Sequence, residues 1–334
     1  MPQQRPSLLE QSDSSRNTGK VNSFDPMPRR WAAKLMVGAA AGLCLPMGKL
    51  SAVAASDSSS MLTRAIPSTG EKLPVIGLGT WQTFDVGTSS SERTPLSQVL
   101  SLLVKSGGRI VDSSPMYGRA EEVIGDLADG LQLQQKLFFA TKVFTRGRDA
   151  GIQSMERSFA RLKTNRIDLM QVHNLVDVGT HLQTMREWKA KGRFRYIGVT
   201  HYNETAFPEL EKVLRSEKVD FVQINYSIGE READQRILPL TQEKGIAVII
   251  NRPFGGGDLF SRVRSKPLPN WAGEFDCHSW AQFLLKWILA NPVVTCAIPA
   301  TNNPEHLQDN VAASFGRLPD DKMRQRMVDI VTSL

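Results

Sequence analysis

The 334-residue sequence has few cysteines, no glycine-rich nucleotide fingerprint and no apolar run long enough to cross a membrane. Three cysteines do not make the disulfide framework of a small secreted scaffold, and no metal site is predicted. Neither the G-x-G-x-x-G turn of dinucleotide-binding open sheets nor a P-loop occurs. The apolar stretch 35–45 is shorter than the roughly 20 residues that span a bilayer. Cys296 lies in a strand-like apolar run, so we expect a buried small hydrophobe rather than a functional thiol.

The sequence also lacks a basic stripe with interleaved aromatic residues, which argues against nucleic acid as a partner. The net charge of +7 is partly local. Residues 1–54 contain seven lysines and arginines against three acidic residues, so they carry +4 and leave +3 for the rest of the chain. That remainder is too diffuse to indicate a polyanionic partner. Apolar residues at 41% and charged residues at 22% are typical of a globular enzyme.

The first sixty residues differ in composition from the rest of the chain and have the parts of an export signal. A polar leader, residues 1–28, precedes Arg29-Arg30, the apolar stretch 35–45, and Ala52-Val53-Ala54 before a serine-rich segment. The paired arginines indicate the twin-arginine route. We therefore predict a leader over residues 1–60 and a periplasmic protein without stable membrane insertion. The alternative is a disordered leader with a chance apolar patch on a cytoplasmic protein.

From about residue 72 the chain alternates short apolar runs with segments of helical spacing. The runs are rich in β-branched residues and indicate parallel strands buried on both faces. Seven are evident, and an eighth is expected near residues 73–80 or just after the leader; the seven are residues 109–111, 137–140, 167–172, 196–199, 221–224, 246–250 and 293–298. Apolar residues three and four apart predict the intervening helices, at residues 120–127, 152–162, 182–191, 207–214 and 280–289.

Eight such units in the length after the leader predict an α/β fold, a (β/α)8 TIM barrel, as a single domain over residues 61–334. A doubly wound open sheet is the alternative. It would normally carry the glycine-rich turn that this sequence lacks, which favours the barrel. In such barrels the chemistry lies where strands end and loops begin.

Polar and titratable residues close successive predicted strands. Asp112 ends the second strand and is followed within five residues by Tyr117, while Lys142 ends the third and His173 the fourth. Any one of them alone would be an ordinary polar loop or capping residue. Together they form an acid–base set. An ammonium beside a tyrosine lowers its pKa, an aspartate can hold that lysine charged, and a histidine can hydrogen-bond a carbonyl oxygen. A carbonyl held this way accepts a hydride from a nicotinamide.

These residues and their neighbours resemble the catalytic tetrad of the aldo-keto reductases. Asp112-Ser-Ser-Pro-Met-Tyr117-Gly, Ala-Thr-Lys142-Val and Gln-Val-His173-Asn stand in the family's order, and Gly77-Leu-Gly-Thr-Trp81 looks like its first-strand motif. Ile197-Gly-Val-Thr-His201 and the segment from Ile298 to Asn310 resemble its fifth-strand and last-strand motifs. The resemblance covers about residues 64–334. It implies a (β/α)8 barrel, NAD(P)H bound across the carboxyl edge, with NADPH as the first expectation, and reduction of aldehydes or ketones.

The resemblance also implies roles for individual residues. Tyr117 would be the general acid, tuned by Lys142 and Asp112, and His173 would orient the carbonyl. The remaining residues would contact the cofactor: Thr80 and Trp81 beside cofactor and substrate, Thr200 and His201 at the carboxamide, Gln223 under the nicotinamide, Asn251 and Arg252 at the seventh strand, and Thr301, His306 and Asn310 at the adenosine end.

Three positions depart from the family pattern. Thr200-His201 replaces a Ser-Asn pair, and Asn251, followed by Arg252, stands where an aromatic residue stacks on the nicotinamide. Ala300 and His306 stand where NADPH-preferring members often have lysine and arginine. A 2′-phosphate binds best to fixed cations, so NADH is the competing cofactor.

The sequence therefore predicts an NAD(P)H-dependent carbonyl reductase that acts on a small molecule and is a monomer. The three departures from the family pattern are also compatible with an auxiliary or regulatory protein that binds the cofactor but catalyses little. A non-redox barrel enzyme that uses Lys142 as a Schiff-base amine is a third interpretation of the same residues.

Overall fold

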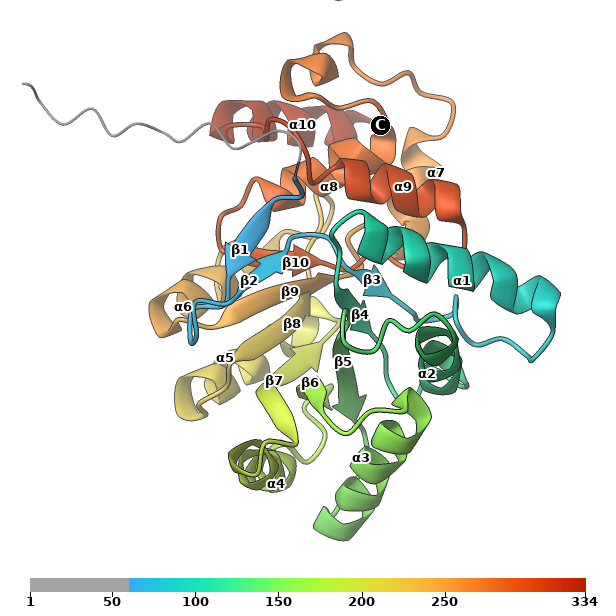
Figure 1. Cartoon of the computed structure of the whole chain (residues 1–334). Coiled ribbons are helices and arrows are strands. Elements are labelled where there is room, and N and C mark those ends of the chain that lie inside the picture. Colours follow the sequence, from blue (N-terminus) through green and yellow to red (C-terminus); the bar gives the residue numbers. More distant parts are fainter. Residues whose placement is uncertain (1–59) are drawn as a thin grey trace, which may run out of the picture. The chain divides into compact units, whose positions relative to one another are not determined.

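The computed structural model describes residues 60–334, so the predicted leader lies outside the described residues apart from Ser60. Eight parallel strands form one sheet in the order β10-β9-β8-β7-β6-β5-β4-β3 (Figure 1). They are β3 (Leu78–Gly79), β4 (Ile110–Asp112), β5 (Phe138–Val143), β6 (Ile167–His173), β7 (Phe194–His201), β8 (Phe221–Asn225), β9 (Ala247–Asn251) and β10 (Val294–Ala297). The seven predicted strands are confirmed, and β3 is the eighth.

The sheet closes into a barrel between its first and last strands. Parallel bridges join Ile76 to Ala297 and Gly79 to Ala300, and the Gly77 amide donates to the Ala297 carbonyl over 2.9 Å. Glycine is required where the strands approach closely. A Cβ at Gly79 would lie 2.7 Å from the Ile298 carbonyl oxygen, and one at Gly77 would lie 2.9 Å from the Ile110 Cβ. The predicted TIM barrel is therefore confirmed.

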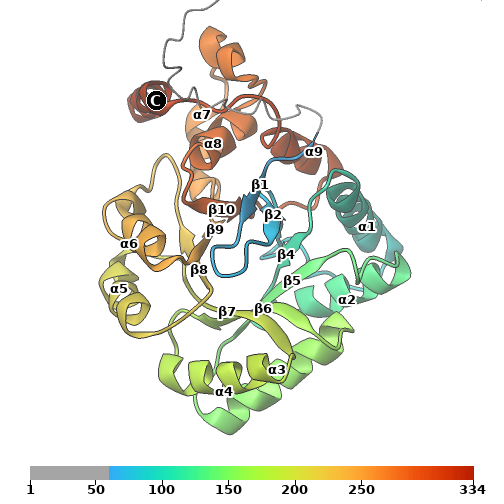
Figure 2. The same cartoon turned by 60° about the vertical axis from the view of Figure 1, so that its left-hand side comes forward.

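Helices cover the outside of the barrel, as Figure 2 shows. The helices are α1 (Ser90–Lys105), α2 (Ala120–Gly130), α3 (Arg148–Leu162), α4 (Val178–Ala190), α5 (Phe207–Ser216), α6 (Ile237–Lys244), α7 (Asp258–Val263), α8 (Trp280–Leu289), α9 (Pro304–Ala312) and α10 (Asp321–Ser333). The helical spacing in the sequence located α2, α3, α4, α5 and α8. α1 packs beside α9, next to the seam between β3 and β10. No helix among residues 60–334 is long and apolar enough to span a membrane.

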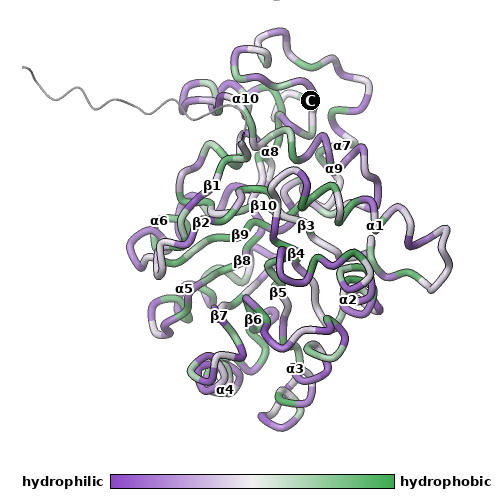
Figure 3. Tube along the Cα trace, in the orientation of Figure 1, coloured by the Kyte–Doolittle hydropathy of each residue, from purple (hydrophilic) through white to green (hydrophobic). Residues whose placement is uncertain are grey.

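Successive side chains of each strand point to opposite faces, and this alternation produces two apolar clusters. Ile110, Leu169 and Ile249 fill the inside of the barrel together with Cys296, which is fully buried as expected. Their neighbours along the strands pack outward against the helices. In Figure 3 hydrophobic residues accordingly follow the strands, whereas hydrophilic segments gather on the periphery.

An antiparallel hairpin that the sequence did not predict covers the amino end of the barrel. It consists of β1 (Thr63–Ala65) and β2 (Lys72–Pro74), and its residues Ile66 and Leu73 join the interior cluster. Figure 2 shows the hairpin across one end of the ring of strands. With that end filled, the opposite end is the one that remains open for a ligand.

Candidate active site

The four residues of the predicted tetrad meet at the carboxyl edge of the barrel. Asp112 is the last residue of β4 and His173 is the last residue of β6, while Lys142 lies near the end of β5 between them. Tyr117 lies in the loop after β4. The order β4-β5-β6 in the sheet is what brings these three strand ends together.

A buried ion pair forms the base of the site. The Lys142 ammonium donates to the Asp112 carboxylate over 2.6 Å and to the Ser113 carbonyl over 2.7 Å. Both charged side chains are almost completely buried, at 1% and 4% exposure. The second oxygen of Asp112 accepts from Gln223 Nε2 at 2.7 Å and from Gln171 Nε2 at 3.3 Å. Buried charges are tolerated only when they are paired and hydrogen-bonded, and this carboxylate meets both conditions.

Tyr117 lies above this pair. The Lys142 Nζ is 5.1 Å from the centre of the phenol ring. Burial raises the pKa of Tyr117 above its usual value, and the Asp112 charge acts in the same direction, while the Lys142 ammonium lowers it. The Lys142 ammonium thus acts in the direction expected from the sequence, but burial outweighs it. The phenol therefore keeps its proton at neutral pH, which is the state a proton donor needs.

His173 faces Tyr117 edge-on. The ring centres are 6.0 Å apart at an interplanar angle of 86°, and the Phe144 ring also packs against the imidazole, with centres 5.4 Å apart. Burial, together with the charges of Lys142 and His201, lowers the pKa of His173 to about 3. The imidazole is therefore neutral at physiological pH. Its Nδ1 lies 3.1 Å from the Ser114 hydroxyl, and when that hydroxyl donates, Nε2–H is left as a donor.

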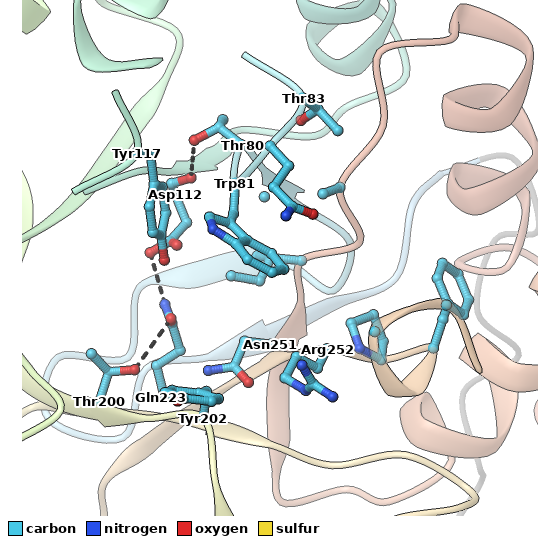
Figure 4. Close-up of a pocket in the computed structure, with 18 of the residues that line it drawn as sticks. Thr80, Trp81, Thr83, Asp112, Tyr117, Thr200, Tyr202, Gln223, Asn251 and Arg252 are labelled. Atoms are coloured by element: carbon cyan, nitrogen blue, oxygen red, sulfur yellow. Dashed lines mark hydrogen bonds between the residues drawn. The ribbon is translucent and has the colours of Figure 1, made fainter. Parts of the chain in front are cut away.

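A cavity of about 670 Å³ opens above these residues (Figure 4). It unites nine of the predicted site residues, which come from the ends of six strands and the loops after them. They are Thr80, Trp81, Asp112, Tyr117, His173, Thr200, Gln223, Asn251 and Arg252. Lys142 is not part of the lining, because it is buried beneath the lining residues Asp112 and Tyr117.

Gln223 connects the predicted cofactor side of the cavity to the ion pair. Its amide accepts from the Thr200 hydroxyl at 3.3 Å while it donates to Asp112 (Figure 4). Its sequence-based role, under the nicotinamide ring, is compatible with its place in the lining. The hydrogen bond to Asp112 is an additional contact that the sequence did not indicate.

His201 does not line the cavity. Its Nδ1 accepts from the Asn203 amide at 3.2 Å, and its ring lies parallel to that of Tyr202 with centres 5.7 Å apart. Burial lowers the pKa of His201, and the hydrogen bond from Asn203 opposes this. The lining residue is instead its neighbour Tyr202.

The three residues predicted at the adenosine end lie beside the cavity rather than in its wall. Thr301 and Asn310 are buried and His306 is exposed, near or within α9. The Thr301 hydroxyl accepts from the Asn303 amide over 3.0 Å, just before α9 begins. Ala300, which precedes Thr301, does line the cavity. The cavity thus extends toward α9 without including these three side chains.

Several lining residues were not predicted from the sequence. They include Met116 and Asn174, each next to a tetrad residue, and Tyr202, Phe254 and Phe260. Adjacency to the tetrad was the signal available for the first two. Three buried side-chain oxygens in the lining have no hydrogen-bond partner among residues 60–334, namely Thr83 Oγ1, Asn174 Oδ1 and Asn251 Oδ1. Such buried polar atoms usually find partners within the protein or in ordered water.

Comparison with known proteins agrees with this geometry. The model of the Aldo/keto reductase family matches residues 75–327. The chain is 28% identical over 247 residues to methylglyoxal reductase YeaE of Escherichia coli, covering 72% of this chain and 85% of that one. It is 27% identical over 273 residues to morphine 6-dehydrogenase of Pseudomonas putida, covering 77% and 87%.

The solved structures give the same fold. An aldo/keto reductase of Klebsiella pneumoniae in complex with NADP and acetate superposes with a TM-score of 0.66 at 24% identity, covering 78% of this chain and 93% of that one.

Within residues 60–334 no group of three or more histidine, cysteine or acidic side chains could hold a metal ion. The chain is an oxidoreductase that belongs to the aldo/keto reductase family.

Proposed function

We propose that the protein reduces aldehydes or ketones to alcohols with NADPH, using Tyr117 as the proton donor. The observation that carries the proposal is the protonated Tyr117 above the buried Lys142–Asp112 pair, with neutral His173 beside it on the same cavity. This arrangement supplies a proton and two hydrogen-bond donors where a carbonyl oxygen gains negative charge.

The residues of this chain would act in sequence. Tyr117 and His173 hydrogen-bond the carbonyl oxygen, which makes its carbon more electrophilic. When bound, reduced nicotinamide supplies the hydride to that carbon. The Tyr117 proton then passes to the oxygen, and the resulting phenolate is stabilised by the Lys142 ammonium, 5.1 Å from the ring centre. Asp112 keeps that ammonium in place through its 2.6 Å contact.

The cofactor would lie between β7 and β10 along the carboxyl edge. Thr200, Gln223 and Asn251 line the cavity, and their hydroxyl and amide groups suit a carboxamide, which both donates and accepts hydrogen bonds. Arg252 suits a phosphate-bearing ligand because its guanidinium reaches the cavity wall. The assignment of Thr301, His306 and Asn310 to the adenosine end stays a prediction, since none of them is among the cavity-lining residues. NADPH is supported by the Klebsiella pneumoniae relative, which holds NADP.

The decisive experiment replaces the proton donor. We expect Tyr117→Phe to lower kcat by at least about 100-fold, the usual contribution of a positioned general acid, while NADPH binding measured by fluorescence titration is retained. Unchanged turnover in Tyr117→Phe would refute the assignment. Wild-type protein that binds NADPH but reduces no carbonyl in a broad panel would instead support an auxiliary role.

We also propose that residues 1–60 direct the protein to the periplasm by the twin-arginine route. The Arg29-Arg30 pair, the apolar stretch and the A-x-A site support this. A reporter fused to residues 1–60 should be exported, and Arg29→Lys with Arg30→Lys should keep it in the cytoplasm. Export that is indifferent to both substitutions would contradict the proposal.

A further inference from the structure

The loop that carries Tyr117 is only partly held by contacts within itself. The Tyr117 amide donates to the Ser114 carbonyl over 3.0 Å, and the Tyr117 carbonyl accepts from the Ala120 amide over 3.0 Å. Gly118 follows with a left-handed φ of +57°. Arg119, the residue just before α2, has no side-chain hydrogen bond that caps the helix. The remaining contact on this stretch comes from another part of the chain.

That contact is made by the carboxylate of Asp85, which lies in the loop after β3. Its Oδ1 accepts from the Arg119 amide at 2.9 Å. A Cβ on Gly118 would lie 2.3 Å from the same carboxyl group, so the carboxyl packs directly against the Gly118 backbone. Only glycine leaves this space free, and glycine also adopts the left-handed φ without strain. Asp85 therefore contacts the two residues that follow Tyr117 in the chain.

The loop that presents Asp85 is itself anchored. The preceding residue, Phe84, is fully buried in the cluster that packs outward against the helices, and its amide donates to the Thr80 carbonyl over 3.1 Å. The Thr80 hydroxyl donates to the Asp112 carbonyl over 2.9 Å (Figure 4). The loop after β3 is thus joined to the segment after β4 at two points, one at the strand ends and one just beyond Tyr117.

Asp85 is separate from the reacting groups. It is not among the residues that line the cavity, and its side chain is exposed. An exposed hydrogen bond at the start of a helix contributes modestly to stability. A reacting group displaced by about 1 Å, in contrast, can lower a rate about 100-fold. Loss of the Asp85 contact should therefore affect the rate of the reaction more than the stability of the fold.

We propose that Asp85 is a positioning residue for the proton donor. It holds the backbone just after Tyr117, so that the phenol stays over Lys142 and beside His173. This inference rests on the proposed function, in which Tyr117 gives its proton to the carbonyl oxygen. The contact needs an acceptor oxygen at the place of Asp85 Oδ1 rather than a negative charge, so asparagine should replace the aspartate and alanine should not.

The chain offers a matched control in another βα unit. Asp177, in the loop after β6, accepts from the Gly147 amide through Oδ2 at 2.7 Å, and Gly147 directly precedes α3. Neither Asp177 nor Gly147 lines the cavity. Asp177→Ala removes the same kind of contact between two loops without touching the segment that carries Tyr117.

The test measures the single-turnover rate of hydride transfer, because that rate separates chemistry from product release. The NADPH-loaded full chain is mixed with the better of two probe aldehydes, 4-nitrobenzaldehyde and methylglyoxal, and the loss of NADPH fluorescence is followed. We expect Asp85→Ala to lower the rate at least about tenfold, while the Kd of NADPH and the KM of the aldehyde stay within about twofold. Asp85→Asn should remain within about threefold of wild type, and Asp177→Ala within about twofold.

Two further readouts separate positioning from a merely structural role. The solvent isotope effect on the single-turnover rate should increase in Asp85→Ala, because proton transfer from a displaced donor limits more of the rate. The midpoints of urea unfolding should be similar in Asp85→Ala and Asp177→Ala, although only the former is slow.

Gly118→Ala disturbs the same contact from the other side, because the added Cβ displaces the carboxylate. We expect it to lower the rate at least as much as Asp85→Ala. Adding Asp85→Ala to it should lower the rate by less than about twofold more, since the contact is already lost. Losses that multiply in the double variant would show that the two residues act independently, and would overturn the inference.

The remaining outcomes distinguish this inference from the proposed function. A wild-type rate in Asp85→Ala, an equal loss in Asp177→Ala, or no recovery in Asp85→Asn overturns the inference and leaves Tyr117 as the proton donor. If wild type reduces no carbonyl, or if Tyr117→Phe keeps the wild-type rate, the proposed function itself fails and the inference fails with it.

Discussion

The two ends of the barrel contain similar charged and polar residues but use them differently. At the amino end, Arg195 donates to Asp168 over 2.9 Å and to Glu71, and the Tyr196 hydroxyl donates to Glu71 over 2.7 Å. Asp168 also accepts from the Phe139 amide at 2.9 Å. Each of these groups has its partner within the protein, beneath a hairpin that fills the barrel.

At the carboxyl end the hydrogen-bonding is incomplete. The Lys142–Asp112 pair is satisfied, but Asn174 and Asn251 each keep a buried oxygen on the cavity wall without a partner in the described part of the chain. Asn174 and Arg252 also adopt left-handed backbone conformations, with φ of +52° and +48°. The two ends therefore differ most plainly in that the hairpin fills one and the cavity opens at the other.

The largest effect that distinguishes the ends should result from removing the cation of the buried pair. Lys142→Met leaves the Asp112 carboxylate buried without a counter-charge, so we expect the free energy of unfolding to fall by about 3–5 kcal/mol in urea denaturation. Activity should be lost as well. Adding Asp112→Asn should recover part of the stability but not the activity. If Lys142→Met alone were as stable as wild type, the buried pair would not be important for stability.

A smaller effect should appear in the pH dependence of stability. The folded-state pKa of His173 is lowered from 6.5 to about 3, so the folded protein binds fewer protons than the unfolded chain between these values. The free energy of unfolding therefore decreases as the pH falls through this window. Between about pH 6.5 and about pH 5 the expected decrease is about 2 kcal/mol. His173→Gln should lose correspondingly less over the same range. Equal losses in both proteins would show that His173 does not carry this dependence.

The smallest effect is expected at the amino end. Glu71→Gln weakens a partly exposed ion pair with Arg195, so the free energy of unfolding should fall by less than about 1 kcal/mol. The value of kcat/KM should stay within about twofold of wild type, since Glu71 lies at the opposite end from the cavity. A marked fall in kcat for this variant would break the comparison, because it would show that the two ends are coupled.

Much of the fold could be predicted because parallel strands buried on both faces leave continuous apolar runs in the sequence. The hairpin could not, since β1 and β2 have only three residues each and no such run. The tetrad was predictable because each of its residues stands at or just after a strand end. His201 was predicted to contact the cofactor from its position alone, whereas the residue that lines the cavity is its neighbour Tyr202. The pKa of Tyr117 depended on burial, which spacing in a sequence does not reveal.

The seam between β3 and β10 has a consequence for folding. The residues that bridge it, such as Ile76 and Ala297, are more than two hundred residues apart in sequence. Closing so long a loop is entropically costly and slow compared with forming neighbouring units. The cavity takes Thr80 from one side of the seam and Ala300 from the other. A chain that has formed most of its helices and strands thus has Asp112 and Lys142 but no complete cavity, and the ability to bind cofactor marks a barrel that has finished folding.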